Sequence, residues 1–324
     1  MQIIDRKEMS FELHEPVLVI GLGGVGSKLA TEAAKSFGSN CLIISNNEKD
    51  LGSSHSVHVS TKPVLNPSVQ LIRSYTIKAE SQIRDEISQY SSVIIMANLA
   101  GKSGSAMSPI VSQICKEQNK SVISFAIMPF KYEKDRIFNS GISLKRLKVN
   151  SNCTVVIDND AFLDSNPNLS SKNCYEITNS AILHVVSSLR DSSIQQDTHL
   201  LTTSHSNSDF EKSLKDSMKM LYENAPPNSV KRSMVYVIGG ENAPIGMINA
   251  ISKISGNVLH EEGAQVDIST SASEESKVVM LSSIQGETRF DRYDPLGVIP
   301  KENSLDWEEP ECSINCDLEL HQLE

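Results

Sequence analysis

Two glycine-rich turns contain the residues best suited to bind an anion. The first, Gly21-Leu22-Gly23-Gly24-Val25-Gly26-Ser27, and the second, Ala100-Gly101-Lys102-Ser103-Gly104-Ser105, each follow a short apolar run. Small side chains let backbone N–H groups approach a phosphate closely, and the dipole of a helix that starts there favours negative charge. The turns therefore predict a phosphate site, although ordinary tight strand–helix connections have the same composition.

The first turn also fits the Gly-x-Gly-x-x-Gly pattern of dinucleotide-binding folds when it is read from Gly21. Such folds bind the ribose with an acidic residue about 20 positions later, and Glu48 is close to that spacing. An NAD- or FAD-dependent enzyme that uses the loop from Gly21 to Gly26 is therefore one alternative. The second turn is not a P-loop, because Met96 occupies the position of the earlier glycine.

The elements that would hold these turns predict an α/β fold with a doubly wound, mostly parallel sheet. Apolar runs indicate strands at 16–20, 41–44, 93–96, 121–127, 153–157, 233–238 and 277–284. Helical spacing indicates helices at 28–37, 76–90, 109–119, 135–148, 176–189, 210–223 and 245–254. Residues 52–75 and 190–206 have no clear period and are expected to be irregular.

These elements suggest five consecutive parts of the chain. We expect an N-terminal arm (1–15), a nucleotide domain (16–175), a long central helix with its connection (176–206), a smaller α+β domain (207–286) and a tail (287–324). The last 38 residues carry 11 acidic residues and the single tryptophan, Trp307. Such a composition predicts a disordered acidic tail.

Composition limits the partners and the location. The formal net charge of −10 argues against a general nucleic-acid binder and against an anionic membrane surface. No apolar run approaches the roughly 20 residues that span a bilayer, so we expect no transmembrane segment. Six scattered cysteines predict free thiols in a reducing cytoplasm, and the histidines show no metal-ligand spacing.

Seven motifs in order resemble the tubulin/FtsZ superfamily, and they resemble FtsZ of the archaeal type more than tubulin. Over residues 15–285 they are 19–26 (first phosphate loop), 93–109 (signature loop and helix), Pro129-Phe130-Lys131-Tyr132-Glu133, Asp158-Asn159-Asp160, Tyr175 with Asn179, Asn207-Ser208-Asp209-Phe210 and 234–240. The resemblance implies a GTPase-type fold that binds GTP or GDP, with Mg²⁺ as its cation.

The resemblance also assigns roles to single positions. Its nucleotide-binding residues would be Gly21, Gly23, Gly24, Gly26, Ser27, Gly101, Lys102, Ser103, Gly104, Ser105, Glu133, Arg136, Asn159, Tyr175 and Asn179. Asp209 would be the catalytic acid that reaches the nucleotide of the next subunit when subunits stack head to tail. The end of the tail would bind a protein partner.

Several positions depart from the pattern of that superfamily. Ala100, Lys102 and Ala106 replace glycines of the signature loop, and alanine does not readily adopt positive φ. Ser180 replaces the aspartate that binds guanine, and Lys212 replaces the second catalytic acid.

Asp209 fits a helix N-cap as well as a catalytic acid, and Lys102 either neutralises a phosphate or lies across an empty site. We therefore expect a divergent FtsZ-like cytoskeletal protein with a structural or regulatory role and weak or no GTP hydrolysis. An active polymerising GTPase of cell division is the other alternative.

Overall fold

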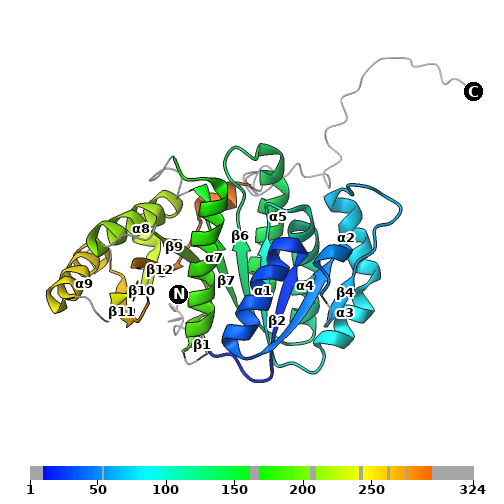
Figure 1. Ribbon diagram of the computed structural model, residues 1–324, viewed down its shortest axis with the longest axis horizontal. Helices are drawn as coiled ribbons and strands as arrows, with labels where there is room; N and C mark the ends of the chain where they lie inside the picture. The colour runs from blue at the N-terminus through cyan, green and yellow to red at the C-terminus, as the bar shows by residue number, and fades with distance from the viewer. Residues whose placement is uncertain are drawn as a thin grey trace, which may run out of the picture.

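A ten-stranded mixed sheet forms the centre of the protein (Figure 1). The computed structural model describes residues 10–52, 55–160, 168–190, 192–204, 209–240, 244–260, 263–273 and 276–293. The strands are β2 (Val17–Leu22), β3 (Asn40–Ser45), β4 (Ser56–His58), β5 (Ser92–Asn98), β6 (Ser121–Ile127), β7 (Cys153–Ile157), β9 (Thr198–Thr203), β10 (Val230–Ile238), β11 (Gln265–Ser271) and β12 (Lys277–Ile284). Their order is β11-β10-β12-β9-β7-β6-β5-β2-β3-β4.

Among these described strands only β12 runs antiparallel to its neighbours. The predicted fold class, a doubly wound and mostly parallel sheet, is confirmed. All residues of β2 and β5 are buried, as expected for parallel strands that are covered on both faces.

Helices cover both faces of the sheet (Figure 1). α1 (Gly23–Phe37) and α7 (Ser171–Ser188) pack on one face with alternate residues of β2, Val17 and Val19. The other face carries α2 (Val69–Lys78), α3 (Glu80–Ile87), α4 (Lys102–Glu117), α5 (Lys134–Asn150), α8 (Phe210–Asn224) and α9 (Ile245–His260). The alternation of side chains along each strand supplies both cores.

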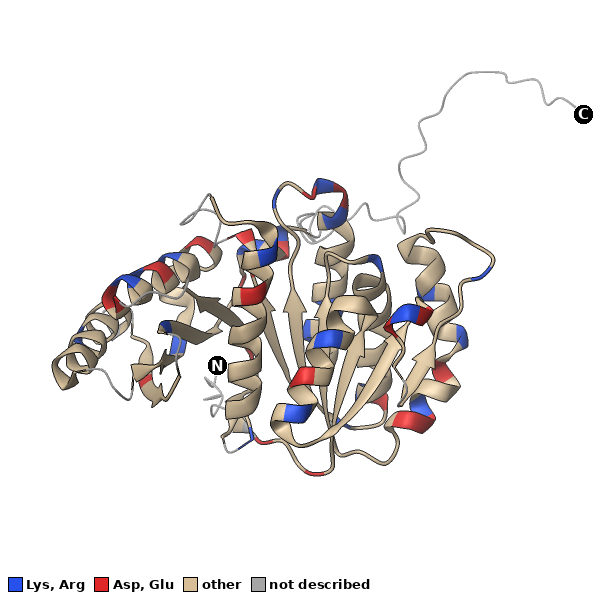
Figure 2. Cartoon of the chain, in the orientation of Figure 1, with Lys and Arg blue, Asp and Glu red and all other residues tan. Residues whose placement is uncertain are grey.

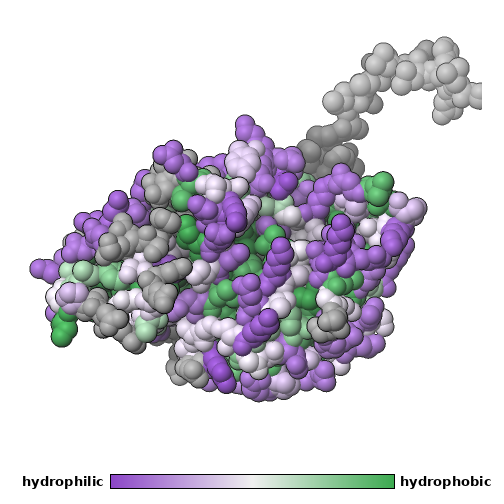
Figure 3. Space-filling model, in the orientation of Figure 1, coloured by the Kyte–Doolittle hydropathy of each residue, from purple (hydrophilic) through white to green (hydrophobic). Residues whose placement is uncertain are grey.

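Most charged residues lie on the helices and in the connections (Figure 2), and a few lie on strands, such as Lys231 and Arg232 of β10. On the face seen in Figure 3, hydrophobic residues are scattered among hydrophilic ones. None of the helices in the described part of the chain is long and apolar enough to cross a membrane.

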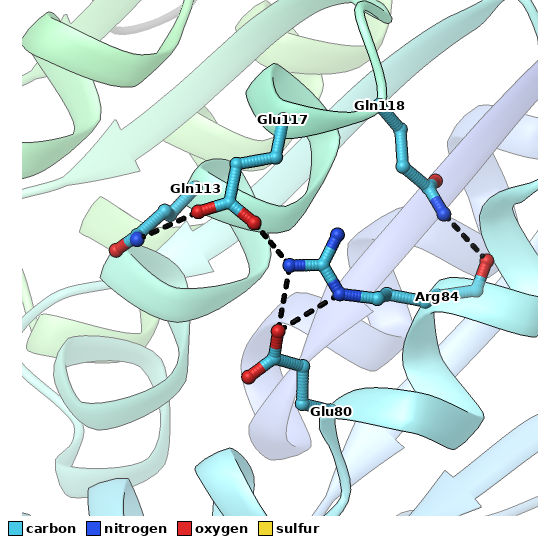
Figure 4. A network of polar contacts seen from close by, with 5 residues as sticks. All are labelled: Glu80, Arg84, Gln113, Glu117 and Gln118. Atoms are coloured by element: carbon cyan, nitrogen blue, oxygen red, sulfur yellow. Dashed lines mark hydrogen bonds and ion pairs between the residues drawn. The ribbon is translucent and has the colours of Figure 1, made fainter.

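A polar network joins α3 to the end of α4 (Figure 4). Arg84 donates to Glu80 at 2.8 and 2.6 Å and also pairs with Glu117. Gln113 holds the other carboxylate oxygen of Glu117 at 2.9 Å, and Gln118 donates to the backbone carbonyl of Arg84 at 3.0 Å. The network fixes the C-terminal end of the helix whose first turn borders the cavity described below.

Both helices that follow the glycine-rich turns begin earlier than predicted. α1 begins at Gly23 rather than at residue 28, and α4 begins at Lys102 rather than at 109. Pro109 lies inside α4, where proline leaves the carbonyl four residues earlier without its helical N–H. That carbonyl, of Ser105, accepts a hydrogen bond from Ser143 Oγ of α5 at 2.6 Å instead. The sequence could not show this, because the compensating donor is far away in the chain.

Polar strands account for the other main differences between the predicted and the observed elements. The segment 190–206, expected to be irregular, contains a strand: β9 lies between β7 and β12 in the middle of the sheet, with His199 and Thr202 buried. β11 was not predicted, because only alternate residues of this edge strand are partly covered. The strands expected in two domains therefore belong to one sheet, joined where Thr154 of β7 pairs with Thr198 of β9.

Other boundaries shift as well. Two helices, α2 and α3, replace the single helix expected at 76–90, and β4 with the start of α2 lies in the segment expected to be irregular. α7 begins at Ser171 and α9 extends to His260. β1 (Ser10–Phe11), in the predicted arm, pairs with β8 (Ile194–Gln195).

The chain is folded beyond residue 287, where the predicted tail begins. The 3-10 helix η4 (Arg289–Tyr293) packs against α5, with Phe290 fully buried. Asp291 of η4 accepts from Lys148 Nζ at 2.7 Å, and Arg289 pairs with Asp158 at 2.7 Å. Residues 294–324 lie outside the described part of the chain.

Candidate functional site

A cavity of about 370 Å³ lies at the carboxyl ends of β2, β3 and β5. From β2 the chain passes to β3 and β4 on one side and then returns to β5 on the other. Ligands of doubly wound sheets bind at this kind of reversal in strand order. The described lining consists of Leu22, Gly23, Gly24, Val25, Asn46, Asn47, Asp50, Asn66, Pro67, Ile72, Asn98, Gly101, Lys102, Ser103 and Gly104.

The N-termini of α1 and α4 both open into the cavity. In the described structure neither helix has a side-chain cap at its first turn, and neither first turn contains an acidic residue. The first N–H groups of a helix have no partner within the helix, and the helix dipole makes this end positive. The arrangement is therefore suited to an anion.

Two glycines shape the cavity wall through their missing side chains. Gly23 has φ +66°, and a Cβ there would lie 2.6 Å from Ser103 Cβ. A Cβ at Gly24 would lie 3.0 Å from Asp50 Oδ1, so this carboxylate faces the glycine turn.

Three other predicted glycines are required by packing. A Cβ at Gly26 would lie 2.4 Å from the carbonyl oxygen of Met96, and one at Gly21 would lie 2.6 Å from that of Gly26. At Gly104 the nearest atom, the carbonyl oxygen of Asn98, would be 2.1 Å away. These glycines let α1 and α4 approach the strands, whether or not a ligand is present.

Polar side chains cross the cavity. Lys102 Nζ donates to Asn66 Oδ1 at 2.7 Å, and Ser103 Oγ donates to Asn46 Oδ1 at 2.6 Å. Asp50 Oδ2 accepts from Ser45 Oγ at 2.7 Å. Of the polar lining residues, Asn46, Asn47, Asp50, Asn66 and Asn98 were not predicted. Asn46 and Asn47 directly follow β3 and Asn98 ends β5, and this position could have indicated them, because the carboxyl ends of parallel strands meet at one edge of a sheet. Asp50 ends a 3-10 turn and Asn66 lies in the connection before α2, so no strand end indicates them.

The other predicted contacts lie elsewhere. The described lining of the cavity includes none of Ser27, Ser105, Glu133, Arg136, Asn159, Tyr175 and Asn179. Ser27 Oγ donates to the carbonyl of Gly23 at 2.7 Å, and Ser105 Oγ to that of Lys102 at 3.4 Å. Both hydroxyls therefore serve their own helices.

Glu133 and Arg136 form an ion pair at 2.6 Å. Tyr175 packs edge-on against Phe130 with ring centroids 5.6 Å apart, and burial, followed by the charge of Glu133, raises the pKa of Tyr175. Asn179 Oδ1 is buried without a hydrogen-bond partner in the described structure. The residues that the resemblance assigns to the ribose and the base therefore lie near the start of α7.

The turn after β7 is part of a buried polar cluster. Asn159 is fully buried and donates to the carbonyl of Met128 at 3.1 Å. Asp160 accepts from the backbone N–H of Lys131 at 2.6 Å. Burial, reinforced by the neighbouring charge of Asp158, raises the pKa of Asp160 to about 6. This turn connects β7 to the loop after β6 and, through Asp158, to η4.

The predicted catalytic acid, Asp209, and one departure from the superfamily pattern, Ser180, both have hydrogen-bond partners within the chain. Asp209 Oδ1 accepts from the backbone N–H of Lys212 at 3.1 Å and so caps α8. Ser180 Oγ accepts from Lys277 Nζ at 2.6 Å, and Lys277 is only 3% exposed. Asn207 and Ser208 lie outside the described residues. Among the described residues no group of three His, Cys, Asp or Glu side chains is arranged to hold a metal ion.

The family model and the relatives that match this chain agree on one family of proteins. Residues 66–167 match the GTPase domain of the Tubulin/FtsZ family. "Cell division protein FtsZ 2" of Halobacterium salinarum is 27% identical over 120 residues, which cover 37% of this chain and 30% of that protein. "Cell division protein FtsZ 1" of Pyrococcus woesei is 24% identical over 196 residues, covering 59% and 51% of the two chains. The matches thus span about a third to a half of these relatives.

Solved structures show the same fold. An empty FtsZ dimer of M. jannaschii superimposes with a TM-score of 0.64 at 17% identity, covering 82% of this chain and 87% of that one. CetZ2 from Haloferax volcanii, in a GTPγS-bound protofilament, gives 0.62 at 17% identity, with 87% and 98% covered.

Proposed function

We propose that the chain, a divergent FtsZ-like member of the tubulin/FtsZ superfamily, is a cytoskeletal protein with a degenerate nucleotide site. In this proposal it binds GTP or GDP weakly, hydrolyses GTP slowly or not at all, and acts as a structural or regulatory subunit in the cytoplasm.

One observation carries the nucleotide proposal: the cavity at the strand-order reversal, which receives two helix N-termini without side-chain caps in the described structure. Phosphate oxygens would accept from the first N–H groups of α1 and α4, and Lys102 would add a positive charge. The volume of about 370 Å³ is within the lower range of small-molecule sites.

Three features support weak binding. The Asp50 carboxylate faces Gly24 and would repel a polyphosphate unless a cation lies between them. Lys102 is engaged by Asn66, so that bond must break before the lysine can serve a phosphate. Where guanine would need an acceptor, Ser180 is bonded to the buried Lys277.

Weak hydrolysis follows from the catalytic loop. Asp209 already caps α8, and Lys212 takes the place of a second acid. A single capping carboxylate offers little to polarise an attacking water and its cation. Mg²⁺, when bound, would neutralise phosphate charge, and Asp50 is the carboxylate in the cavity that is placed to hold it.

Self-association is proposed from the relatives. Two of the structural relatives are an FtsZ dimer and a CetZ2 protofilament. We extend this to head-to-tail stacking, with Asp209 at the contact to the next subunit, and to a protein partner for the tail. We propose that residues 16–175 and 207–286 are two functional parts of the chain, whose strands belong to one continuous sheet.

The NAD- or FAD-dependent alternative receives no support. The relatives named above are FtsZ and CetZ proteins. Glu48, the candidate ribose ligand, is exposed and bonded to Lys62 Nζ at 2.7 Å.

Thermal unfolding with and without Mg–GTP, Mg–GDP, Mg–ATP and NAD tests the proposal. A ligand at a hundred times its dissociation constant stabilises the native state by about 2.7 kcal/mol, which raises Tm by about 4–5 °C in a chain of this size. We expect a rise with guanine nucleotides at millimolar concentration and little or no phosphate release. No rise with any nucleotide would refute the nucleotide site, whereas rapid turnover would establish an active GTPase.

A further inference from the structure

Arg73 on α2 holds a charge that the described structure does not neutralise. Its Nε and Nη2 atoms are buried and have no hydrogen-bond acceptor among the described residues. Burial, followed by the nearby charge of Arg146, lowers the pKa of Arg73. Arg73 as a whole is partly exposed, and because a guanidinium keeps its proton in proteins, two of its nitrogens that lie buried without an acceptor are costly. Such a group is expected to receive an anion from elsewhere.

Arg146 on α5 is the second cation of this pair. Both α2 and α5 pack against α4, which brings the two guanidinium groups near each other. Arg146 is exposed, and within the described part of the chain neither arginine takes part in an ion pair. Two neighbouring guanidinium groups favour carboxylate or phosphate oxygens, which they can bind in a bidentate manner.

The chain itself supplies carboxylates at this place. η4 is fixed to α5 by the Lys148–Asp291 pair and by the buried Phe290, so the described chain ends, at Tyr293, beside the helix that carries Arg146. Residues 294–324 contain nine acidic residues and one lysine. At about 3.3 Å per extended residue, this segment can reach about 100 Å, far more than the width of one helix.

We propose that the acidic C-terminal segment, residues 294–324, binds back onto the Arg73–Arg146 pair. The carboxylates compensate both guanidinium groups, and the pair in turn tethers the segment across α5 and α2. This inference does not depend on nucleotide binding.

Docking there would affect the cavity. Ile72, the residue before Arg73, lines the cavity, as do Asn66 and Pro67 just ahead of α2. A segment bound to Arg73 would therefore lie against the helix that borders the cavity.

The single tryptophan provides the test. Trp307 lies in the acidic segment, next to Asp306, Glu308 and Glu309. Quenching of its fluorescence by neutral acrylamide, measured on the full chain, reports how accessible the segment is. Raising sodium chloride from about 50 mM to about 500 mM shortens the Debye length, so we expect Trp307 to become more accessible.

Arg73→Gln/Arg146→Gln should give the accessible state already at low salt, with a roughly two- to fivefold loss in the docked-to-free ratio, as is typical of a few partly exposed ion pairs. The variant Glu308→Gln/Glu309→Gln/Glu311→Gln removes carboxylates of the segment instead of the guanidinium groups and should give the same accessible state at low salt. Lys28→Gln/Lys35→Gln, which makes the same charge change on exposed positions of α1, is the matched control and should leave quenching unchanged.

Arg146→Gln alone, at an exposed position, keeps the test valid if Arg73→Gln prevents folding. Two outcomes would overturn the proposal. One is Trp307 quenching that is equal in the parent chain, in both arginine variants and at both salt concentrations. The other is docking that is lost equally in the α1 control, because that would indicate a general effect of net charge.

Discussion

Replacing Asp50 by asparagine should strengthen nucleotide binding. Asp50 is partly buried and faces Gly24 at the first turn of α1, where the proposed phosphate would accept from backbone N–H groups. The amide oxygen of an asparagine at this position could still accept the hydrogen bond that Ser45 Oγ gives to Asp50 Oδ2. The substitution therefore removes a charge while retaining the local contact.

The expected magnitude follows from Coulomb's law. A phosphate charge about 5 Å from the carboxylate is repelled by about 3 kcal/mol at an effective dielectric constant of 20 and by about 0.8 kcal/mol at 80. Because Asp50 is partly exposed, we expect a value of about 1–2 kcal/mol, or about five- to thirtyfold tighter binding. The gain should be largest without Mg²⁺, when no cation screens the carboxylate.

Equilibrium titration with a fluorescent guanine nucleotide, at fixed salt and with and without Mg²⁺, measures this change. Glu48→Gln is the matched control: it removes the same charge two residues away, but Glu48 is exposed and paired with Lys62. Equal affinities of Asp50→Asn and the parent protein would refute the repulsion. An affinity that falls in Asp50→Asn only when Mg²⁺ is present would assign the carboxylate to the cation instead.

Three further predictions concern stability. Ser143→Ala should lower the free energy of unfolding by about 1–3 kcal/mol, because it removes the donor to the Ser105 carbonyl that Pro109 leaves without a helical N–H. In a Pro109→Ala background, urea unfolding should show a smaller loss of stability on Ser143→Ala. An equal loss in both backgrounds would argue against this pairing. The pKa of Asp160 is raised to about 6 in the folded state, so its contribution to stability is lost as the pH rises from about 4 through 6. Asp160→Asn should flatten that part of the curve of unfolding free energy against pH, and an unchanged curve would contradict the assignment. Gly26→Ala should lower the free energy of unfolding by about 1–3 kcal/mol through overpacking, because the new Cβ meets the backbone carbonyl of Met96. Gly24→Ala should unfold near the Tm of the parent protein, because its Cβ meets only the side-chain carboxylate of Asp50. Similar losses in the two variants would contradict the packing role of Gly26.

The parallel core could be predicted because it depends on local patterns. Continuous apolar runs such as those of β2 and β5 are buried on both faces, and they have that composition whatever their neighbours are. The bounds of β7 and β12 follow the predicted ranges 153–157 and 277–284. β9 could not be predicted in this way, because His199 and its threonines become core residues only through the strands on either side.

The two glycine-rich turns were also visible in the sequence, and both border the cavity. What each glycine does could not be read from the turns, because the role depends on which distant atom would meet its Cβ. At Gly26 that atom is a carbonyl of β5, and at Gly24 it is the carboxylate of Asp50. For the same reason the sequence did not show that Asn159 donates to the carbonyl of Met128; the ligand contact of Asn159 stays a prediction.

The sequence by itself determined the α/β class, the positions of the main strands and the resemblance to FtsZ, since these depend on composition and spacing along the chain. The tertiary structure decided which polar groups meet. Asp50, Asn66 and Lys102 come from separate connections and share one cavity because the order of β3, β2 and β5 brings those connections to one edge. Contacts between residues far apart in the chain depend on strand order and packing, and local sequence patterns do not encode either of these.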